Sequence, residues 1–112
     1  MLIYIVDADK GFAEYVQTLL GGEVFLDGVT AVTAMNEKVP DVVVCAMQLV
    51  GPNAVAMLHE MRSDVATMNV PVVVLTDGEL KADLRGYGVV RVLNKATMMP
   101  DDLIEAVTQN GH

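Results

Sequence analysis

The sequence predicts an α/β domain built around a doubly wound parallel sheet. Short, continuous apolar runs recur along the chain, segments with helical spacing lie between them, and the two alternate five times within 112 residues. Continuous apolar runs of roughly four to eight residues are typical of strands covered on both faces. Strand and helix patterns that alternate in this way predict a parallel sheet sandwiched by helices, with right-handed crossovers.

Five apolar runs are the expected strands, and the second of them is weak. The runs are Leu2–Val6, Glu23–Phe25, Val42–Ala46, Val72–Leu75 and Val89–Leu93. Five such β-α units favour the flavodoxin-like strand order 2-1-3-4-5. In that order the carboxyl ends of strands 1 and 3 are neighbours, so a site is expected at that edge of the sheet.

Helical patterns fill the segments between the strands. The expected helices lie at residues 12–20, 31–35, 54–61, 80–87 and 100–107. The pair Gly21 and Gly22 ends the first helix, and Asn53 is a plausible N-cap of the third. Pro100 suits the first turn of the last helix, and the positive end of the helix dipole there favours the acids Asp101 and Asp102.

Length and composition predict one domain, residues 1–110, followed by a loose terminus or tag remnant at residues 111–112. Apolar residues make up 53% of the chain, but no run approaches the ~18 residues of a membrane helix. The start of the chain lacks a basic signal region, and the single Cys45 cannot form an internal disulfide, so we expect a cytoplasmic protein. A net charge of −8 argues against direct binding of nucleic acid.

Polar residues follow several of the expected strands. Strand 1 ends in VDAD with Asp7 and Asp9, strand 4 in LTD with Thr76, and strand 5 in NKA with Lys95. Acids, a hydroxyl and a lysine therefore converge on one rim of the sheet. Strand 3 ends at Ala46, which brings nothing reactive to that rim.

At these positions the chain resembles the response-regulator receiver domain over essentially its whole length. That family has two acids after strand 1, an acceptor aspartate ending strand 3, a Thr or Ser ending strand 4, and Lys-Pro after strand 5. The phrase PDVVVCAMQLVGPN resembles the family's third strand and the turn after it. Asp7, Thr76 and Lys95 match the family motif, whereas Ala46 replaces the acceptor and Ala8 the second acid.

The departures from the family indicate a vestigial pocket. Its residues are Asp7, Asp9, Ala46, Thr76 and Lys95. Aspartyl phosphorylation needs a carboxylate nucleophile, and Mg²⁺ prefers carboxylate oxygens, so we expect no phosphorylation, metal, cofactor or enzymatic activity. We expect Lys95 to pair with Asp7 or Asp9, and for Asp7 this ion pair is favoured over a remaining role as a metal ligand. We expect a trans Lys95–Ala96 bond where the family has proline. Val92 replaces the aromatic residue that the family uses as a switch.

Several residues have simpler interpretations than a role in a site. Asp9 is as well suited to cap the first helix as to line the pocket. Thr76 can be an ordinary β-branched residue at a strand end. Cys45 is expected in the core. His59 is expected to be exposed, and no second His or Cys at ligand spacing supports a metal.

The resemblance implies a degenerate receiver, a phosphorylation-independent protein–protein interaction module in two-component signalling or a phosphorelay. One alternative is a receiver that accepts phosphate on another acid of the rim, Asp9 or Asp77. Another is a flavodoxin-like cofactor-binding domain, although the acids of VDADKGF would repel a phosphate.

The expected partner is a signalling protein or a fused output domain, with no direct nucleic acid and no membrane. The family docks partners or dimerises through helix 4, strand 5 and helix 5, so a homodimer through this face is also possible. The corresponding interaction face here is Leu80, Leu84, Tyr87, Arg91, Met98, Met99 and Val107.

Overall fold

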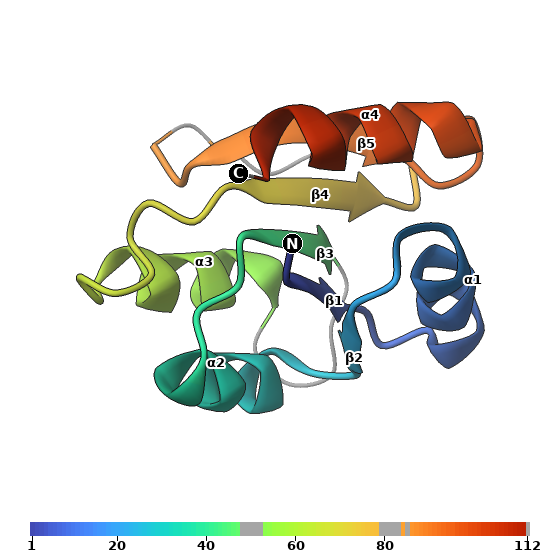
Figure 1. The fold of residues 1–112 in the computed structure, drawn as a ribbon. Helices are drawn as coiled ribbons and strands as arrows, with labels where there is room; N and C mark the ends of the chain where they lie inside the picture. The colour runs from blue at the N-terminus through green and yellow to red at the C-terminus, as the bar shows by residue number, and fades with distance from the viewer. Residues whose placement is uncertain (48–52, 79–83, 85, 112) are drawn as a thin grey trace.

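The protein folds as a five-stranded parallel sheet with helices on both faces (Figure 1). A computed structural model describes residues 1–47, 53–78, 84 and 86–111. The strand order is β2-β1-β3-β4-β5, and each neighbouring pair is parallel. The predicted doubly wound sheet and its 2-1-3-4-5 order are therefore confirmed.

The elements follow the predicted runs closely. The strands are β1 (Ile3–Val6), β2 (Glu23–Phe25), β3 (Val42–Ala46), β4 (Val72–Thr76) and β5 (Val89–Asn94). The helices within the described residues are α1 (Lys10–Leu20), α2 (Gly28–Glu37), α3 (Ala54–Arg62) and α4 (Pro100–Asn110). The helix expected at residues 80–87 falls mostly outside the described residues, where only Leu84 and the turn at 86–88 can be placed.

Local capping explains where the helices begin. The side chains of Asp9, Asp27 and Asn53 each accept a hydrogen bond from the backbone N–H three residues later. These bonds satisfy amide groups that have no partner within the helix. The cap at Asn53 was predicted, as was Pro100 in the first turn of α4. Gly21 ends α1 at a φ of 73°, a conformation that favours glycine.

Each face of the sheet carries its own core. On one face α2 and α3 pack on alternate strand residues, and the largest buried side chains there are Tyr4, Met35, Met57, Leu58 and Met61. On the other face α1 and α4 pack on the remaining strand residues, among them Ile5, Val16, Leu75, Leu103 and Val107. The central strands β1, β3 and β4 are buried along their whole length, which is the reason for their continuous apolar sequences.

The edge strand β5 is less well covered. A register shift between Val72 and Val73 interrupts its pairing with β4. Such a bulge bends a strand and disturbs its inward and outward alternation. On this edge strand Val90 and Val92 are exposed, Val92 to 41%.

The end of the chain differs from the prediction. Gly111 was expected to belong to a loose terminus, but it is buried, and its N–H donates to the carbonyl of Val107 at the end of α4. A Cβ there would approach the side chains of Met1 and Val42 closely, so the site leaves little room for a larger residue. His112 lies outside the described residues. No helix within the described ranges is both long and apolar enough to cross a bilayer.

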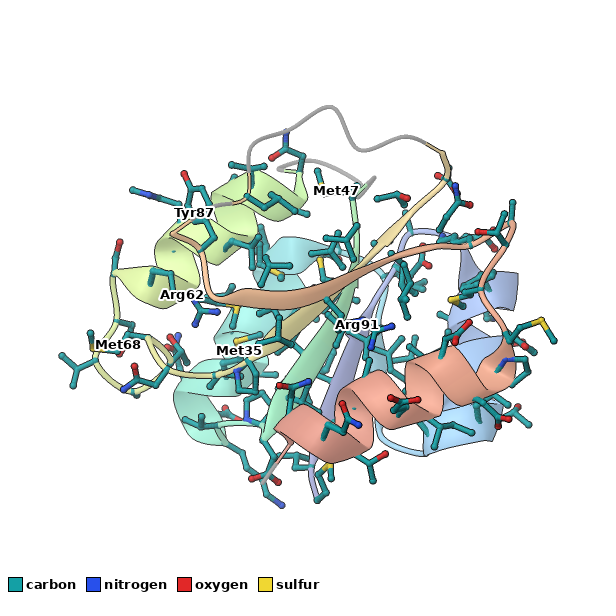
Figure 2. All side chains as sticks on the ribbon, turned by 90° about the horizontal axis from the view of Figure 1, so that it is seen from above. Met35, Met47, Arg62, Met68, Tyr87 and Arg91 are labelled. Carbon is teal, nitrogen blue, oxygen red and sulfur yellow. The ribbon has the colours of Figure 1, made fainter. Side chains whose placement is uncertain are left out.

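Arg62 joins two segments that are distant in the sequence. Its guanidinium donates to the carbonyls of Thr67, Met68 and Val70 in the connection after α3, and to that of Tyr87 before β5, at 2.6–3.1 Å. Figure 2 shows Arg62 between the labelled side chains of Tyr87 and Met68. Burial lowers the pKa of the guanidinium. Gly88, at a φ of 72°, leaves the space that this group fills, because a Cβ there would collide with it.

We expect Arg62→Ala to lower the free energy of unfolding by about 2–4 kcal/mol, because four carbonyls lose a charged donor. Arg62→Lys should recover only a small part, since one ammonium cannot reach carbonyls spread over two segments. Urea unfolding followed by circular dichroism measures both. Lys38→Ala, at the exposed cation that caps the end of α2, is the control and should change stability by no more than about 0.5 kcal/mol. An equal loss in the control would contradict the role of Arg62.

Candidate functional site

The carboxyl edge of the sheet brings together the residues that the sequence placed there. Asp7 follows β1, Ala46 ends β3, Thr76 ends β4, and Lys95 follows β5. Because the strands are parallel and adjacent in this order, their ends form one rim, to which the arrowheads of β1, β3 and β4 point in Figure 1. Asp7 and Thr76 are buried, although both are polar.

Asp7 and Lys95 form the expected ion pair. Lys95 Nζ lies 2.8 Å from Asp7 Oδ2, and the two side chains are only 11% and 4% exposed. At this distance Lys95 Nζ and Asp7 Oδ2 form a close ion pair. The other oxygen, Oδ1, accepts from the backbone N–H of Asp9 at 2.9 Å. Each carboxylate oxygen of Asp7 is therefore engaged within the protein.

Lys95 has two further close neighbours, an acid and an aromatic ring. Its Nζ lies 3.8 Å from Asp77 Oδ1, on a side chain that is 67% exposed. It also lies 4.5 Å from the centroid of the Phe12 ring, a cation–π contact. The described residues contain no cis peptide bond, so the Lys95–Ala96 bond is trans as predicted. The lysine is thus enclosed by two acids and an aromatic ring.

The end of β3 is apolar. Ala46 is buried and pairs in register with Leu75, so its methyl group lies in the row of strand ends where the family has a carboxylate. The preceding Cys45 is fully buried in the core on the α2 and α3 side. Burial, with a smaller contribution from the charge of Asp7, raises the pKa of the Cys45 thiol. A protonated, buried thiol is a packing residue, as the sequence indicated.

The remaining polar residues of the rim are used locally. Asp9 is exposed, and its Oδ1 accepts from the N–H of Phe12 at 3.1 Å, which makes it the N-cap of α1. Thr76 Oγ1 donates to the carbonyl of Gly78 at 2.6 Å, across the turn that follows β4. Of the two interpretations left open for each residue, the structure favours the local one. The pocket residues with charges facing each other are Asp7, Lys95 and Asp77.

No metal-binding cluster forms within the part of the chain that the structure describes. No group of three or more His, Cys, Asp or Glu side chains comes together there. His59 is exposed on α3, as expected. At two positions where the family has acids, this chain has alanine. Ala8 is half-buried and Ala46 is buried, and neither side chain brings an oxygen ligand to the rim.

The expected interaction face needs correction. Leu84 is buried in the core on the α2 and α3 side of the sheet. Val107 is buried in the core on the other side, and Met98 packs half-buried against that core. Tyr87 and Arg91 are half-buried, Met99 is 64% exposed, and Leu80 lies outside the described residues. Val90, Val92 and Ile104 were not expected on this surface, although all three are exposed. The bulge in β5 has no signal in the sequence.

A parallel α/β sheet with an acid after β1, a hydroxyl ending β4 and a lysine after β5 defines the receiver class of signalling domains. No protein-family profile matches the chain. The DNA-binding response regulator MtrA of Mycolicibacterium paratuberculosis is 37% identical over 79 residues, which cover 66% of this chain and 34% of the relative. MtrA of Mycobacterium leprae matches to the same extent. The chain spans about a third of the length of these curated relatives.

Solved structures agree over nearly the whole chain. A putative response regulator from Chloroflexus aurantiacus J-10-fl superposes with a TM-score of 0.85 at 27% identity, covering 96% of this chain and 94% of that one. The receiver domain of the putative response regulator NarL from Mycobacterium tuberculosis has the same fold, with a TM-score of 0.77 at 19% identity and coverage of 96% and 92%. The chain is a response-regulator receiver domain.

We expect Lys95→Met to destabilise the protein by about 3–5 kcal/mol, because it leaves a buried carboxylate at Asp7 without its counter-charge. The double variant Asp7→Asn with Lys95→Met removes both charges and should regain most of that loss. Urea unfolding of the four proteins in this double-mutant cycle gives the coupling energy. Asp77→Asn, at the exposed and more distant acid, should cost less than about 1 kcal/mol. Additive effects of the two buried substitutions would contradict a direct interaction.

Proposed function

We propose that this receiver is degenerate and works as a phosphorylation-independent protein–protein interaction module, made by a domain of residues 1–110. The observation that carries this proposal is the buried methyl group of Ala46 at the strand end where the family has its phosphoryl acceptor. Formation of an aspartyl phosphate requires a carboxylate nucleophile, and alanine offers none.

The electrostatics of the rim support the same proposal. A working receiver needs a lysine free to pair with the acceptor and its phosphate. Here Lys95 Nζ is held 2.8 Å from Asp7, with Asp77 and the Phe12 ring on its other sides. The lysine already balances the buried carboxylate, so charge is neutralised without phosphate. The ion pair between Lys95 and Asp7 therefore favours a single arrangement of the rim over a switch between two arrangements.

Magnesium has few ligands to use in such a rim. Mg²⁺ takes oxygen ligands in octahedral geometry and is usually held by one or two carboxylates together with substrate phosphate. With alanine at positions 8 and 46, Asp7 is the remaining buried carboxylate, and its oxygens are engaged by Lys95 and by the N–H of Asp9. We therefore assign no metal or other cofactor, and no catalytic role, to this rim.

The proposed docking surface lies along β5 and α4, which pack against each other. Its exposed apolar residues are Val90, Val92, Met99 and Ile104. Apolar groups gathered on one side of a small domain are typical of interaction sites. The partner we propose is a protein, either another signalling protein, an output domain, or a second copy of this chain.

DNA binding is not carried over from the curated relatives. The matched 79 residues are about a third of those proteins, and a chain with a net charge of −8 would be repelled by phosphate backbones. The module we propose therefore acts on proteins.

A second candidate function is supported by one observation. Asp77 is exposed at the rim, and its Oδ1 lies 3.8 Å from Lys95 Nζ. A receiver that accepts phosphate on this acid would keep a carboxylate and a lysine close together. Its carboxylate follows β4 rather than β3, however, and Asp7 competes for the same lysine at shorter distance.

We expect no mass increase when the wild-type protein is incubated with acetyl phosphate and Mg²⁺. The double variant Ala8→Asp with Ala46→Asp restores the second acid and the acceptor, so it should bind Mg²⁺ and gain one phosphoryl group. Each single variant should react poorly, because Ala46→Asp alone crowds negative charge against Asp7 and Ala8→Asp alone has no acceptor. Intact-mass spectrometry and calorimetric titration of Mg²⁺ are the measurements.

Asp77→Asn separates the two candidates. Phosphorylation of the wild type that disappears in Asp77→Asn would establish the second function and overturn the first. Phosphorylation that survives in Asp77→Asn would overturn both assignments. A folded double variant that binds no Mg²⁺ would show that positions 8 and 46 do not share one pocket.

For the docking surface, we expect the chain to form a weak dimer through β5 and α4. Val92→Glu should abolish the dimer, because it places a charge in the middle of the apolar contact. Val29→Glu, at another exposed valine on α2, should leave it intact. Sedimentation velocity over a range of protein concentrations measures both. If only Val29→Glu abolishes the dimer, or if the wild type is monomeric throughout, this face is not where copies of the chain meet.

A further inference from the structure

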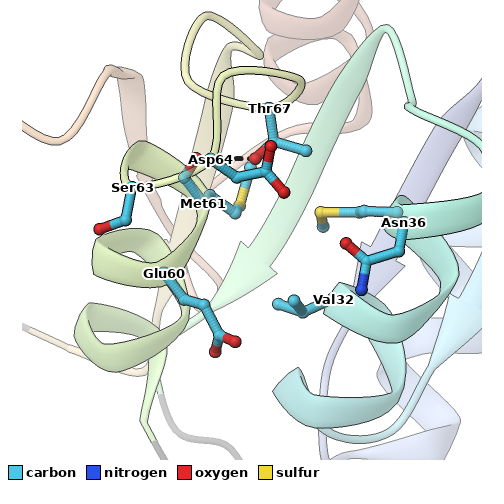
Figure 3. Close-up of a pocket in the computed structure, with 8 residues that line it drawn as sticks. Val32, Asn36, Glu60, Met61, Ser63, Asp64 and Thr67 are labelled. Atoms are coloured by element: carbon cyan, nitrogen blue, oxygen red, sulfur yellow. Dashed lines mark hydrogen bonds between the residues drawn. The ribbon is translucent and has the colours of Figure 1, made fainter.

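A pocket of about 240 Å³ opens between α2 and α3, away from both the rim and the β5–α4 surface (Figure 3). Val32, Met35 and Asn36 line it from α2, and Glu60, Met61, Ser63, Asp64 and Thr67 line it from α3 and the connection that follows. All eight residues belong to the described part of the chain.

The lining is divided into an apolar floor and an acidic rim. Met35 and Met61 are almost completely buried and form the floor together with the half-buried Val32. The side chains of Glu60 and Asp64 are exposed at the mouth, both on the α3 side, and face Val32 and Asn36 of α2 in Figure 3. A group that fills the pocket would therefore meet apolar side chains at its inner end and carboxylates at its outer end.

The acidic side of the pocket is held in place by hydrogen bonds. Asp64 Oδ1 accepts from the N–H of Ala66 at 2.9 Å, and the carbonyl of Asp64 accepts from the N–H of Thr67 at 3.1 Å. Thr67 Oγ1 donates to the carbonyl of Met61 at 2.7 Å. Arg62 ties the same connection to the turn before β5 through four carbonyls. A wall fixed in this way binds a ligand with little loss of conformational entropy.

We propose that this pocket receives a lysine or arginine side chain presented by a protein partner. The aliphatic stem of such a side chain would lie on Val32, Met35 and Met61, and its cationic head would meet the carboxylates of Glu60 and Asp64. Lysine and arginine combine an apolar stem with a charged tip, which is the same division that the pocket shows. Methionine floors adapt readily to the stem that enters them.

Other occupants fit less well. The volume is below the roughly 300–1,000 Å³ of a typical small-molecule or cofactor site, but it suits one side chain. Two carboxylates at a mouth that faces an apolar floor do not make the oxygen cage that a hard metal ion needs. An anion would be repelled by both acids and by the net charge of −8. That net charge would instead steer a basic partner toward the domain.

The test uses protein labelled with ¹³C at the methionine methyl groups, so that Met35 and Met61 report on the pocket and exposed Met99 serves as an internal reference. The probe is an N-acetylated, C-amidated tripeptide with lysine between two alanines, and its counterpart carries norleucine. The lysine peptide should shift the Met35 and Met61 signals saturably, with a dissociation constant in the millimolar range, and leave Met99 unchanged. The shifts should weaken as salt is added.

The double variant Glu60→Gln with Asp64→Asn should weaken binding of the lysine peptide about five- to tenfold, while the amide oxygen at position 64 can still accept from Ala66. The matched control, Glu14→Gln with Glu105→Gln, makes the same change of charge on α1 and α4, on the other face of the sheet. Equal binding of the norleucine peptide, an equal loss in the control, or shifts at Met99 rather than at Met35 and Met61 would each overturn the proposal. The proposed lysine or arginine pocket does not depend on the phosphorylation state of the rim or on the β5–α4 surface. The proposed function can therefore fail while the pocket proposal holds, and the reverse.

Discussion

Burial of the parallel sheet on both faces is the constraint on which the rest of the structure depends. The central strands contribute only apolar side chains to the two cores, so polar chemistry is confined to the strand ends and the loops. At the carboxyl edge this confinement makes Asp7 a carboxylate with almost no access to water. A buried charge of this kind must be paired, and Lys95 provides the counter-charge. At this edge of the sheet, the ion pair balances the charge that burial leaves at Asp7.

The sequence was a reliable guide wherever one residue type has one physical solution. Continuous valine-rich runs have few alternatives to buried parallel strands, and the order of the units then determines which strand ends are neighbours. The ion pair between Asp7 and Lys95 followed from that order together with the absence of a carboxylate at Ala46. The trans bond after Lys95 followed from the replacement of proline by alanine.

The sequence was a poor guide wherever exposure or long-range hydrogen bonding decides. Leu103, Ile104 and Val107 are all apolar, and only the packed helix shows that Ile104 is exposed while Val107 is buried. Arg62 looked like an ordinary cation at the end of a helix. Its four carbonyl partners are backbone groups, which carry no residue signature, so neither its role nor the pocket wall that it supports is visible in the sequence.

Nearly the whole chain separates Asp7 from Lys95, and this distance has a consequence for folding. The first strand leaves the core with a carboxylate that stays uncompensated until the last strand is in place. A chain that has assembled β1 to β4 without β5 would carry an unpaired charge at its centre, and that penalty makes partly assembled states costly. Contacts between distant parts of a chain slow folding but link its parts into one transition. The ion pair between Asp7 and Lys95 thus also disfavours partly folded states of the domain.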